Sequence, residues 1–284
     1  SVQRRHQKLV EIAPAVGLPA ERRDAITRDA VALARSVGYR NAGTFEFLVD
    51  QEGRHYFIEA NPRIQVEHTI TEEITGIDLV QSQILIAGGK TLQELGLRQD
   101  SISLRGYAVQ CRVTSEDPLR SFQPDSGRLE EFRTAHGFGI RLDGGDGHLG
   151  SMVSPHYDSL LIKVIGRALT FEGAVQKVAR ALSEFRIRGI STNIPFLLNV
   201  LAHERFLEGK IDTSFIDSTP KLFRFPRRRN RGMRLLKFLG EVIVNGPMTP
   251  LGTAEPPANI VPEVPAVPAG APPDGWRQLL LAQG

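Results

Sequence analysis

The sequence is poor in cysteine and has no long apolar run. Its 284 residues include a single cysteine, Cys111, so an intramolecular disulfide is impossible and a disulfide-stapled secreted scaffold is excluded. Apolar runs such as 160–165 are far shorter than the roughly 20 residues that cross a bilayer, so no membrane partner is expected. The opening residues, SVQRRHQK, lack both a methionine and the apolar core of a signal peptide. We therefore expect an intracellular protein and a chain that is a piece of a longer one.

The composition is that of a folded protein with an uneven charge. Hydrophobic residues make up 41% and charged residues 24%, which excludes wholesale disorder. The net charge is +3, yet eight basic residues and no acidic residue lie between Lys221 and Lys237. Such a stretch either is a solvated surface segment or binds a phosphate-rich partner. Few aromatic residues interleave with it, so no nucleic-acid partner is predicted.

Hydrophobic periodicity predicts an α+β fold with an antiparallel sheet near its middle. Apolar residues recur at helical spacing in four segments, 20–37, 72–87, 171–184 and 192–208. Two β-rich runs, 43–49 and 55–60, flank the polar turn DQEG and predict a hairpin. Short strands separated by Gly, Pro and Asp turns follow from 105 to 166.

Residues 245–273 differ from the rest of the chain. They hold nine of the 18 prolines and neither lysine nor arginine, so they cannot build a core and are predicted to be a semi-extended linker. The apolar pattern GWRQLLL then begins again, which is typical of the start of a further domain.

The segment FIEANPRIQVEH, residues 57–68, is the strongest candidate for chemistry. If it is extended, its ligand-capable side chains alternate with apolar ones and share one face. These side chains are Glu59, Asn61, Arg63, Gln65 and Glu67. A plain solvent-exposed face remains the alternative.

The predicted hairpin adds a second carboxylate to this face. If residues 50–53 form the turn, Glu46 faces Phe57, and Glu59 is its diagonal neighbour at about 7–8 Å. Two carboxylates this close repel by about 2 kcal/mol unless one is protonated or a cation lies between them. Together with Asn61 they form an oxygen-only ligand set that favours Mg²⁺ or Mn²⁺, the ions that usually neutralise nucleotide phosphates.

Long segments of the chain resemble a known family. From Ser1 to about Ile211 the sequence is similar to the biotin carboxylase component of biotin-dependent carboxylases, an ATP-grasp enzyme. The segments that carry this resemblance are QRRHQKLVEIAPA, AGTFEFLVD, YFIEANPRIQVEHTITEEITGIDLV, CRVTSEDP and SPHYDSLLIKVI. The segments DTSFIDSTPKLF, NRGMRLLKFLGEVIVNGP and GWRQLLL, with the proline-rich linker, resemble the pyruvate carboxylase branch of this family.

The resemblance implies a division of the chain into parts of a longer enzyme. The expected parts are the C-terminal part of the ATP-grasp domain (1–103), the biotin carboxylase C-terminal domain (104–211), the start of an allosteric region (212–246), the linker (247–273) and the beginning of a carboxyltransferase domain (274–284). An N-terminal subdomain and a glycine-rich lid of the family have no counterpart in these residues. The piece by itself is therefore expected to be inactive.

The resemblance also implies roles for the nucleotide site. Glu46 and Glu59 match the glutamates that bind the metal ion and ATP, and Asn61 lies with them as a metal ligand. Gln3 and His6 match positions that line the nucleotide.

For bicarbonate, the resemblance implies two cations and a base. Lys8 and Arg63 match residues that hold bicarbonate, because two cations suit a small anion. Gln65 and the backbone of Val66 match further contacts to it. Glu67 matches the general base that deprotonates bicarbonate for attack on the γ-phosphate of ATP.

For biotin, Arg112 matches the arginine that stabilises the enolate-like oxygen of the deprotonated ring. Tyr157 and Asp158 belong to a motif near the same site. The implied reaction is ATP-dependent carboxylation of biotin through carboxyphosphate. It is the first half of the conversion of pyruvate to oxaloacetate, whose second half belongs to a carboxyltransferase domain.

The resemblance implies further partners: a biotinylated carrier domain, the carboxyltransferase domain of the same longer chain, an acyl-CoA activator bound by the basic stretch, and other copies of the complete chain. The expected compartment is the bacterial cytoplasm or the mitochondrial matrix. Two alternatives remain open. One is the biotin carboxylase part of another acyl-CoA carboxylase, and the other is a binding module without turnover.

Overall fold

The computed structural model describes residues 1–5, 7–145, 147–225 and 231–245. The chain divides into two units, Ser1–Pro226 and Arg227–Gly284. In the second unit the described element is helix α7 (Arg231–Asn245), whose Leu236 and Ile243 side chains are exposed. Within the described ranges no helix is both long and apolar enough to span a bilayer. Arg227–Arg229 and the expected linker and carboxyltransferase segments lie outside the described residues.

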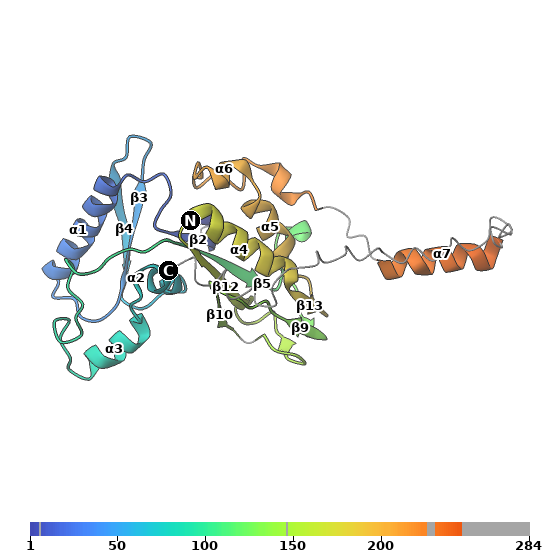
Figure 1. The fold of residues 1–284 in the computed structure, drawn as a ribbon, viewed down its shortest axis with the longest axis horizontal. Coiled ribbons are helices and arrows are strands. Elements are labelled where there is room, and N and C mark those ends of the chain that lie inside the picture. Colours follow the sequence, from blue (N-terminus) through green and yellow to red (C-terminus); the bar gives the residue numbers. More distant parts are fainter. Residues whose placement is uncertain (6, 146, 226–230, 246–284) are drawn as a thin grey trace, which may run out of the picture. The chain divides into compact units, whose positions relative to one another are not determined.

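A five-stranded antiparallel sheet forms the centre of the first unit (Figure 1). In spatial order its strands are β1 (Val2–Arg4), β2 (Gln7–Ala13), β5 (Tyr107–Thr114), β12 (Leu160–Ala168) and β10 (Ile140–Gly144). Strand β2, at the start of the chain, therefore pairs with β5, which forms much later in the sequence, and β1 joins the sheet through β2. This pairing confirms the α+β fold expected from the sequence.

One face of the sheet is apolar, and the opposite face is mixed, because Ala108 and Ile165 form a small buried cluster there beside polar side chains. Along β5, Val109, Cys111 and Val113 are buried in the main core, which includes helix α4 (Phe171–Glu184). The alternate residues Gln110 and Arg112 point to the opposite face, as the two-residue period of a strand requires. Burial raises the pKa of the Cys111 thiol well above its usual range, as expected for an inert buried cysteine.

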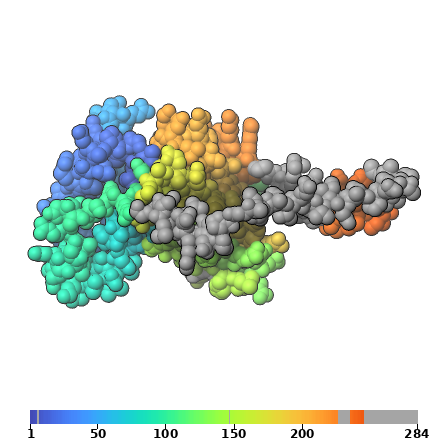
Figure 2. Space-filling view, viewed as in Figure 1, coloured from blue at the N-terminus to red at the C-terminus, as the bar shows by residue number. Residues whose placement is uncertain are grey.

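The expected helix at 20–37 and the expected hairpin are both present, beside the sheet (Figure 1). In the space-filling view these residues are the blue and light-blue atoms at the left of the first unit (Figure 2). They are α1 (Ala20–Ser36), β3 (Thr44–Val49) and β4 (His55–Asn61). The helix predicted over 72–87 is wrong, because two helices occupy this region, α2 (His68–Thr75) and α3 (Leu79–Ala87). Gly76, with φ of 73°, ends α2, and the Asp78 carboxylate accepts the N–H of Gln81 to cap α3.

The predicted helix over 192–208 is likewise divided into α5 (Ile194–Leu201) and α6 (Glu204–Leu207). The break lies at His203, whose side chain accepts the N–H of Arg205 and so starts a new helix. The remaining elements are short: β6 (Glu116–Asp117), η1 (Pro118–Arg120), β7 (Gln123–Pro124), β8 (Gly127–Arg128), β9 (Glu131–Arg133), β11 (Met152–Val153), β13 (Arg186–Arg188) and η2 (Pro220–Phe223).

Asp125 ties two distant loops together, and its removal has a predictable pH dependence. Its carboxylate accepts the N–H of Ser191 at 2.7 Å and that of Ser126 at 2.9 Å. The Ser191 bond, first among the causes, lowers the pKa of Asp125 below its ordinary value. Because folding lowers its pKa, the ionised Asp125 carboxylate stabilises the fold at any pH above the ordinary pKa of aspartate. This contribution is lost as the pH falls through the folded-state pKa.

We expect Asp125→Asn to lower the free energy of unfolding by about 1 kcal/mol at neutral pH. The difference from wild type should begin to shrink as the pH falls below about 4, the ordinary pKa of aspartate, and should disappear once the pH is below the lowered folded-state pKa. Urea denaturation of both proteins, at neutral pH and again well below a pH of about 4, measures this difference in the free energy of unfolding. Asp100→Asn, which removes an exposed carboxylate paired with Arg98, is the control. Equal stability of Asp125→Asn and wild type at neutral pH would contradict the prediction.

Candidate active site

Two glutamates face each other across the hairpin. Glu46 on β3 pairs directly with Glu59 on β4, so the prediction that Glu46 faces Phe57 is wrong. The Asp50 N–H donates to the carbonyl of Arg54, and the Asp50 carboxylate accepts the N–H of Arg54, which makes the loop one residue longer than predicted. A bulge directly after Glu46 shifts the register once more. The carboxylates are therefore closer than predicted, and like charges directly opposite each other favour a cation between them.

Each of the two carboxylates has a polar partner. Lys8 Nζ and Gln65 Nε2 donate to Glu46 Oε1 at 2.8 and 3.2 Å, and Asn61 Nδ2 donates to Glu59 Oε1 at 2.7 Å. Burial opposes ionisation of Glu46, but the Lys8 and Gln65 hydrogen bonds outweigh it and lower its pKa. In the described part of the chain no three or more His, Cys, Asp or Glu side chains gather as a metal cluster. Two carboxylates with an amide oxygen fit Mg²⁺, which usually completes its shell with water and phosphate.

The extended chain predicted for 57–68 ends at Asn61. Pro62 follows and has no N–H to continue the strand ladder. The N–H of Arg63 donates to the carbonyl of Asn61, and the chain turns. The alternation predicted beyond Asn61 is therefore wrong, and Glu67 instead precedes α2 as its N-cap residue.

Glu67 lies between two cations. One carboxylate oxygen forms an ion pair with Lys8 Nζ, and the other accepts from Arg112 Nη2 at 3.0 Å. The three side chains are only 17–19% exposed. Burial opposes the charge of Lys8, but its hydrogen bonds with Glu46 and Glu67 outweigh it and raise its pKa. Gln3 pairs with Lys8 across β1 and β2 and so lies beside this group.

Three buried polar residues of the sheet, which the sequence did not single out, complete the network. Arg112 Nε donates to Glu11 Oε1 at 2.6 Å, and Gln110 Nε2 donates to Glu11 Oε2 at 3.0 Å. Burial raises the pKa of Glu11, although the adjacent Arg112 opposes this. Lys163 Nζ donates to the carbonyl of Val66 at 3.2 Å. Glu11, Gln110 and Lys163 each interrupt an apolar strand run, and this pattern could have identified them.

Three predicted residues stay outside the network. Arg63 is exposed, and its Nη1 donates to the carbonyl of Ile64 at 3.1 Å. Tyr157 is 84% exposed, and the Asp158 carboxylate accepts the N–H of Leu160 at 3.0 Å. No interaction found among the described residues joins any of the three to Glu67. The prediction for His6 lies outside the described residues.

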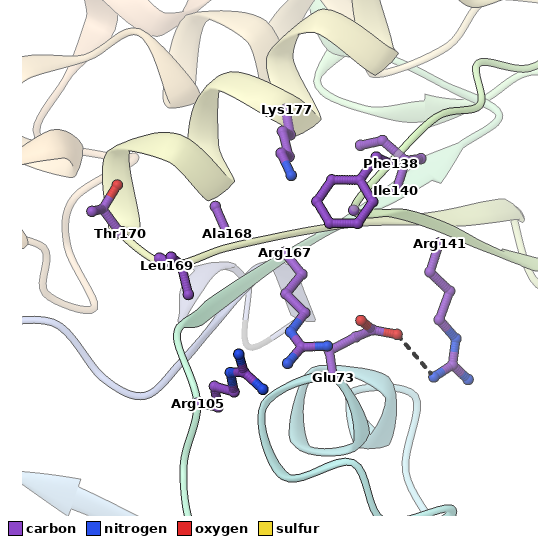
Figure 3. Close-up of a pocket in the computed structure, with 11 residues that line it drawn as sticks. Glu73, Arg105, Phe138, Ile140, Arg141, Arg167, Ala168, Leu169, Thr170 and Lys177 are labelled. Carbon is purple, nitrogen blue, oxygen red and sulfur yellow. Dashed lines mark ion pairs between the residues drawn. The ribbon is translucent and has the colours of Figure 1, made fainter. Parts of the chain in front are cut away.

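A separate pocket of about 770 Å³ lies at the α4 and β12 end of the sheet (Figure 3). Four cationic side chains line it: Arg105, Arg141, Arg167 and Lys177. Lys177 lies over the ring of Phe138 at 4.7 Å, and Glu73 pairs with Arg141 at 3.5 Å. This pocket has no lining residue in common with the predicted site.

Two family models match the chain in succession. Residues 1–95 match the "Carbamoyl-phosphate synthase L chain, ATP binding domain", and residues 110–218 match the "Biotin carboxylase C-terminal domain". The biotin carboxylase domain of Hydrogenobacter thermophilus 2-oxoglutarate carboxylase has a TM-score of 0.77 and 42% identity, over 80% of this chain and 49% of that one. The two models and this structural match identify the fold as that of part of a biotin carboxylase of the ATP-grasp type.

The whole chain aligns with one branch of these enzymes. Pyruvate carboxylase 1 of Caenorhabditis elegans is 59% identical, and the human mitochondrial pyruvate carboxylase is 56% identical, each over 100% of this chain and 24% of the relative. The complete Rhizobium etli pyruvate carboxylase structure has a TM-score of 0.80 and 46% identity, over 90% of this chain and 25% of that one. The chain is homologous to pyruvate carboxylases along its entire length, and it spans about a quarter of the length of these relatives.

Proposed function

We propose that the chain takes part in the biotin carboxylation half-reaction of a pyruvate carboxylase, an ATP-dependent ligase that makes oxaloacetate. The observation that carries the proposal is the position of Glu67, held between Lys8 and Arg112 beside the carboxylate of Glu46. This arrangement combines a base, two cations for anionic oxygens and a carboxylate for metal-bound phosphate. Identity of 59% along the entire chain, including residues 212–284, favours pyruvate carboxylase over another acyl-CoA carboxylase.

In the nucleotide site, Glu46, Glu59 and Asn61 hold Mg²⁺ or Mn²⁺, and Gln3 and His6 line the bound ATP. The metal ion supplies charge neutralisation at the phosphates. The H. thermophilus relative has been solved with MgADP and bicarbonate, which supports this assignment.

In the bicarbonate site, Lys8 binds one anionic oxygen while Arg63, exposed beside the turn, binds the anion from the solvent side. Gln65 and the backbone of Val66 complete the contacts. Glu67 takes the proton from bicarbonate, whose oxygen then attacks the γ-phosphate of ATP to form carboxyphosphate and ADP. Burial of Glu67 and Lys8, each below 20% exposed, supports this step because it limits competition from water.

In the biotin site, carboxyphosphate breaks down to carbon dioxide and phosphate. The released phosphate takes the N–H proton of the biotin ring, and the ring nitrogen then attacks carbon dioxide. Arg112 stabilises the negative oxygen of the biotin ring, and Tyr157 and Asp158 contribute to the binding of biotin. The biotin comes on a carrier domain of the longer chain, and a carboxyltransferase domain passes the carboxyl group to pyruvate. We keep the expected domain limits after residues 103, 211, 246 and 273, and we expect the complete chain to form homo-oligomers in the mitochondrial matrix or bacterial cytoplasm.

The test measures ATP cleavage and transfer of label from ¹⁴C-bicarbonate to biotin by a complete enzyme that contains these 284 residues. We expect both activities to require bicarbonate and Mg²⁺, and we expect neither from the 284-residue chain alone. A complete enzyme that binds ATP but never labels biotin would overturn the proposal and favour the binding module.

The basic stretch between Lys221 and Lys237 is proposed to bind the phosphates of an acyl-CoA activator. The R. etli relative has been solved with acetyl coenzyme A as its allosteric activator. We expect replacement of Arg227, Arg228 and Arg229 by alanine to raise the activator concentration for half-maximal activation about tenfold, while activity without activator is unchanged. A triple alanine variant at the exposed Arg98, Arg120 and Arg133 is the charge-matched control. Unchanged activation in the first variant would contradict this proposal.

A further inference from the structure

Lys163 is a buried cation within an apolar strand. Its side chain is 9% exposed, and its neighbours Ile162 and Val164 are part of the main core. Lysine is rarely buried without a partner, because removing the ammonium group from water is costly. Here Asp143 on β10 lies directly opposite Lys163 and forms an ion pair with it. Asp143 is 33% exposed and lies at the sheet edge, so the pair still leaves the ammonium group inside the protein.

The ammonium group has a second partner in the turn before Glu67. Lys163 Nζ donates to the Val66 carbonyl at 3.2 Å, and Gln110 Nε2 approaches the same oxygen at 3.4 Å. Both donors come from the same face of the central sheet as Arg112. Lys163 lies directly opposite Arg112 on the neighbouring strand, and Gln110 is two residues before Arg112 along β5. The Val66 carbonyl oxygen thus attaches the turn to the rigid sheet, in addition to the Glu67–Arg112 pair.

This attachment sets the orientation of the peptide that joins Val66 to Glu67. The peptide is planar and trans, so a carbonyl held toward the sheet directs the N–H of Glu67 away from it. The same contact limits the rotation that would move the Glu67 side chain away from Lys8 and Arg112. Lys163 does not contact the Glu67 carboxylate itself in any interaction described, and it acts only through the backbone.

We infer that Lys163 is a positioning residue for bicarbonate, because it holds the Val66 carbonyl and thereby keeps the Gln65–Glu67 turn in the conformation that binds the anion. This inference rests on the proposed function. It predicts that loss of Lys163 weakens bicarbonate binding specifically, since ATP and its metal ion are assigned to the hairpin carboxylates on the other side of Lys8.

The test is Lys163→Met in a complete enzyme, with bicarbonate-dependent ATP cleavage as the assay. We expect KM for bicarbonate to rise about tenfold, the effect of losing one hydrogen bond from a charged donor, while KM for ATP stays within twofold. Lys163→Arg retains a charged donor and should restore KM for bicarbonate to within about threefold of wild type. Lys90→Met removes an exposed lysine that pairs with Glu94 and should change neither constant.

A purely structural role would reduce the amount of folded enzyme, and hence kcat, without changing KM for bicarbonate. If Lys163→Met does not fold, the double variant Lys163→Met with Asp143→Leu removes both charges of the pair and is the variant to assay. A wild-type KM for bicarbonate in the folded variant overturns the inference and leaves the proposed function intact. A wild-type enzyme with no bicarbonate-dependent ATP cleavage overturns the proposed function instead.

Discussion

Replacing Glu67 by glutamine is expected to abolish bicarbonate-dependent ATP cleavage in the complete enzyme. The substitution keeps the shape of the side chain and its place between Lys8 and Arg112, but it removes the group that accepts the proton. General bases contribute about 10²- to 10⁴-fold to rate, so the loss of kcat should be at least a hundredfold. Affinity for ATP should stay nearly unchanged, because Glu67 is assigned to bicarbonate. Steady-state ATP cleavage and equilibrium ATP binding measure the two quantities.

A matched control tests whether the effect belongs to Glu67 alone. Glu73 lies on α2, the helix that directly follows Glu67. It is 21% exposed and also pairs with an arginine, Arg141, but it lies in the separate basic pocket. Glu73→Gln should therefore retain bicarbonate-dependent ATP cleavage. Wild-type turnover in Glu67→Gln would remove Glu67 from the role of base.

The largest expected effect on stability comes from Phe196→Ala. The Phe196 ring is fully buried, and its centroid lies 4.9 Å from that of Phe122 and 5.3 Å from that of Phe223. Truncation removes buried apolar surface and leaves a cavity that the close-packed core cannot fill. Losses of this kind lower the free energy of unfolding by about 3–5 kcal/mol. Urea denaturation followed by circular dichroism should show an earlier midpoint with an unchanged slope.

The comparison for this variant is Phe238→Ala, which removes the same ring from a 61% exposed position on α7. Its effect on unfolding of the first unit should stay within about 0.5 kcal/mol. A loss of less than about 1 kcal/mol for Phe196→Ala would mean that the core around Phe122 and Phe223 closes over the cavity.

Local patterns predicted the hairpin and the helices at 20–37 and 171–184, because each depends on residues close together in the chain. They failed where a side chain redirected the backbone over a few residues. Asp50 lengthened the hairpin loop by binding the Arg54 N–H, and His203 started α6 where the apolar pattern ran on. Such capping bonds compete with periodicity and are decided by single side chains.

The family resemblance, the residue types of the candidate site and most of the elements that carry them could be predicted from the sequence, because long motifs and local periodicity depend on neighbouring residues. Which groups meet depended on the tertiary structure. Glu11 and Arg112 are 101 residues apart, and pairing of β2 with β5 brings them together. The register that places Glu46 opposite Glu59 likewise depends on a bulge and a loop. A shift of one residue turns every side chain to the other face, so pairing geometry rather than local pattern assembles the site.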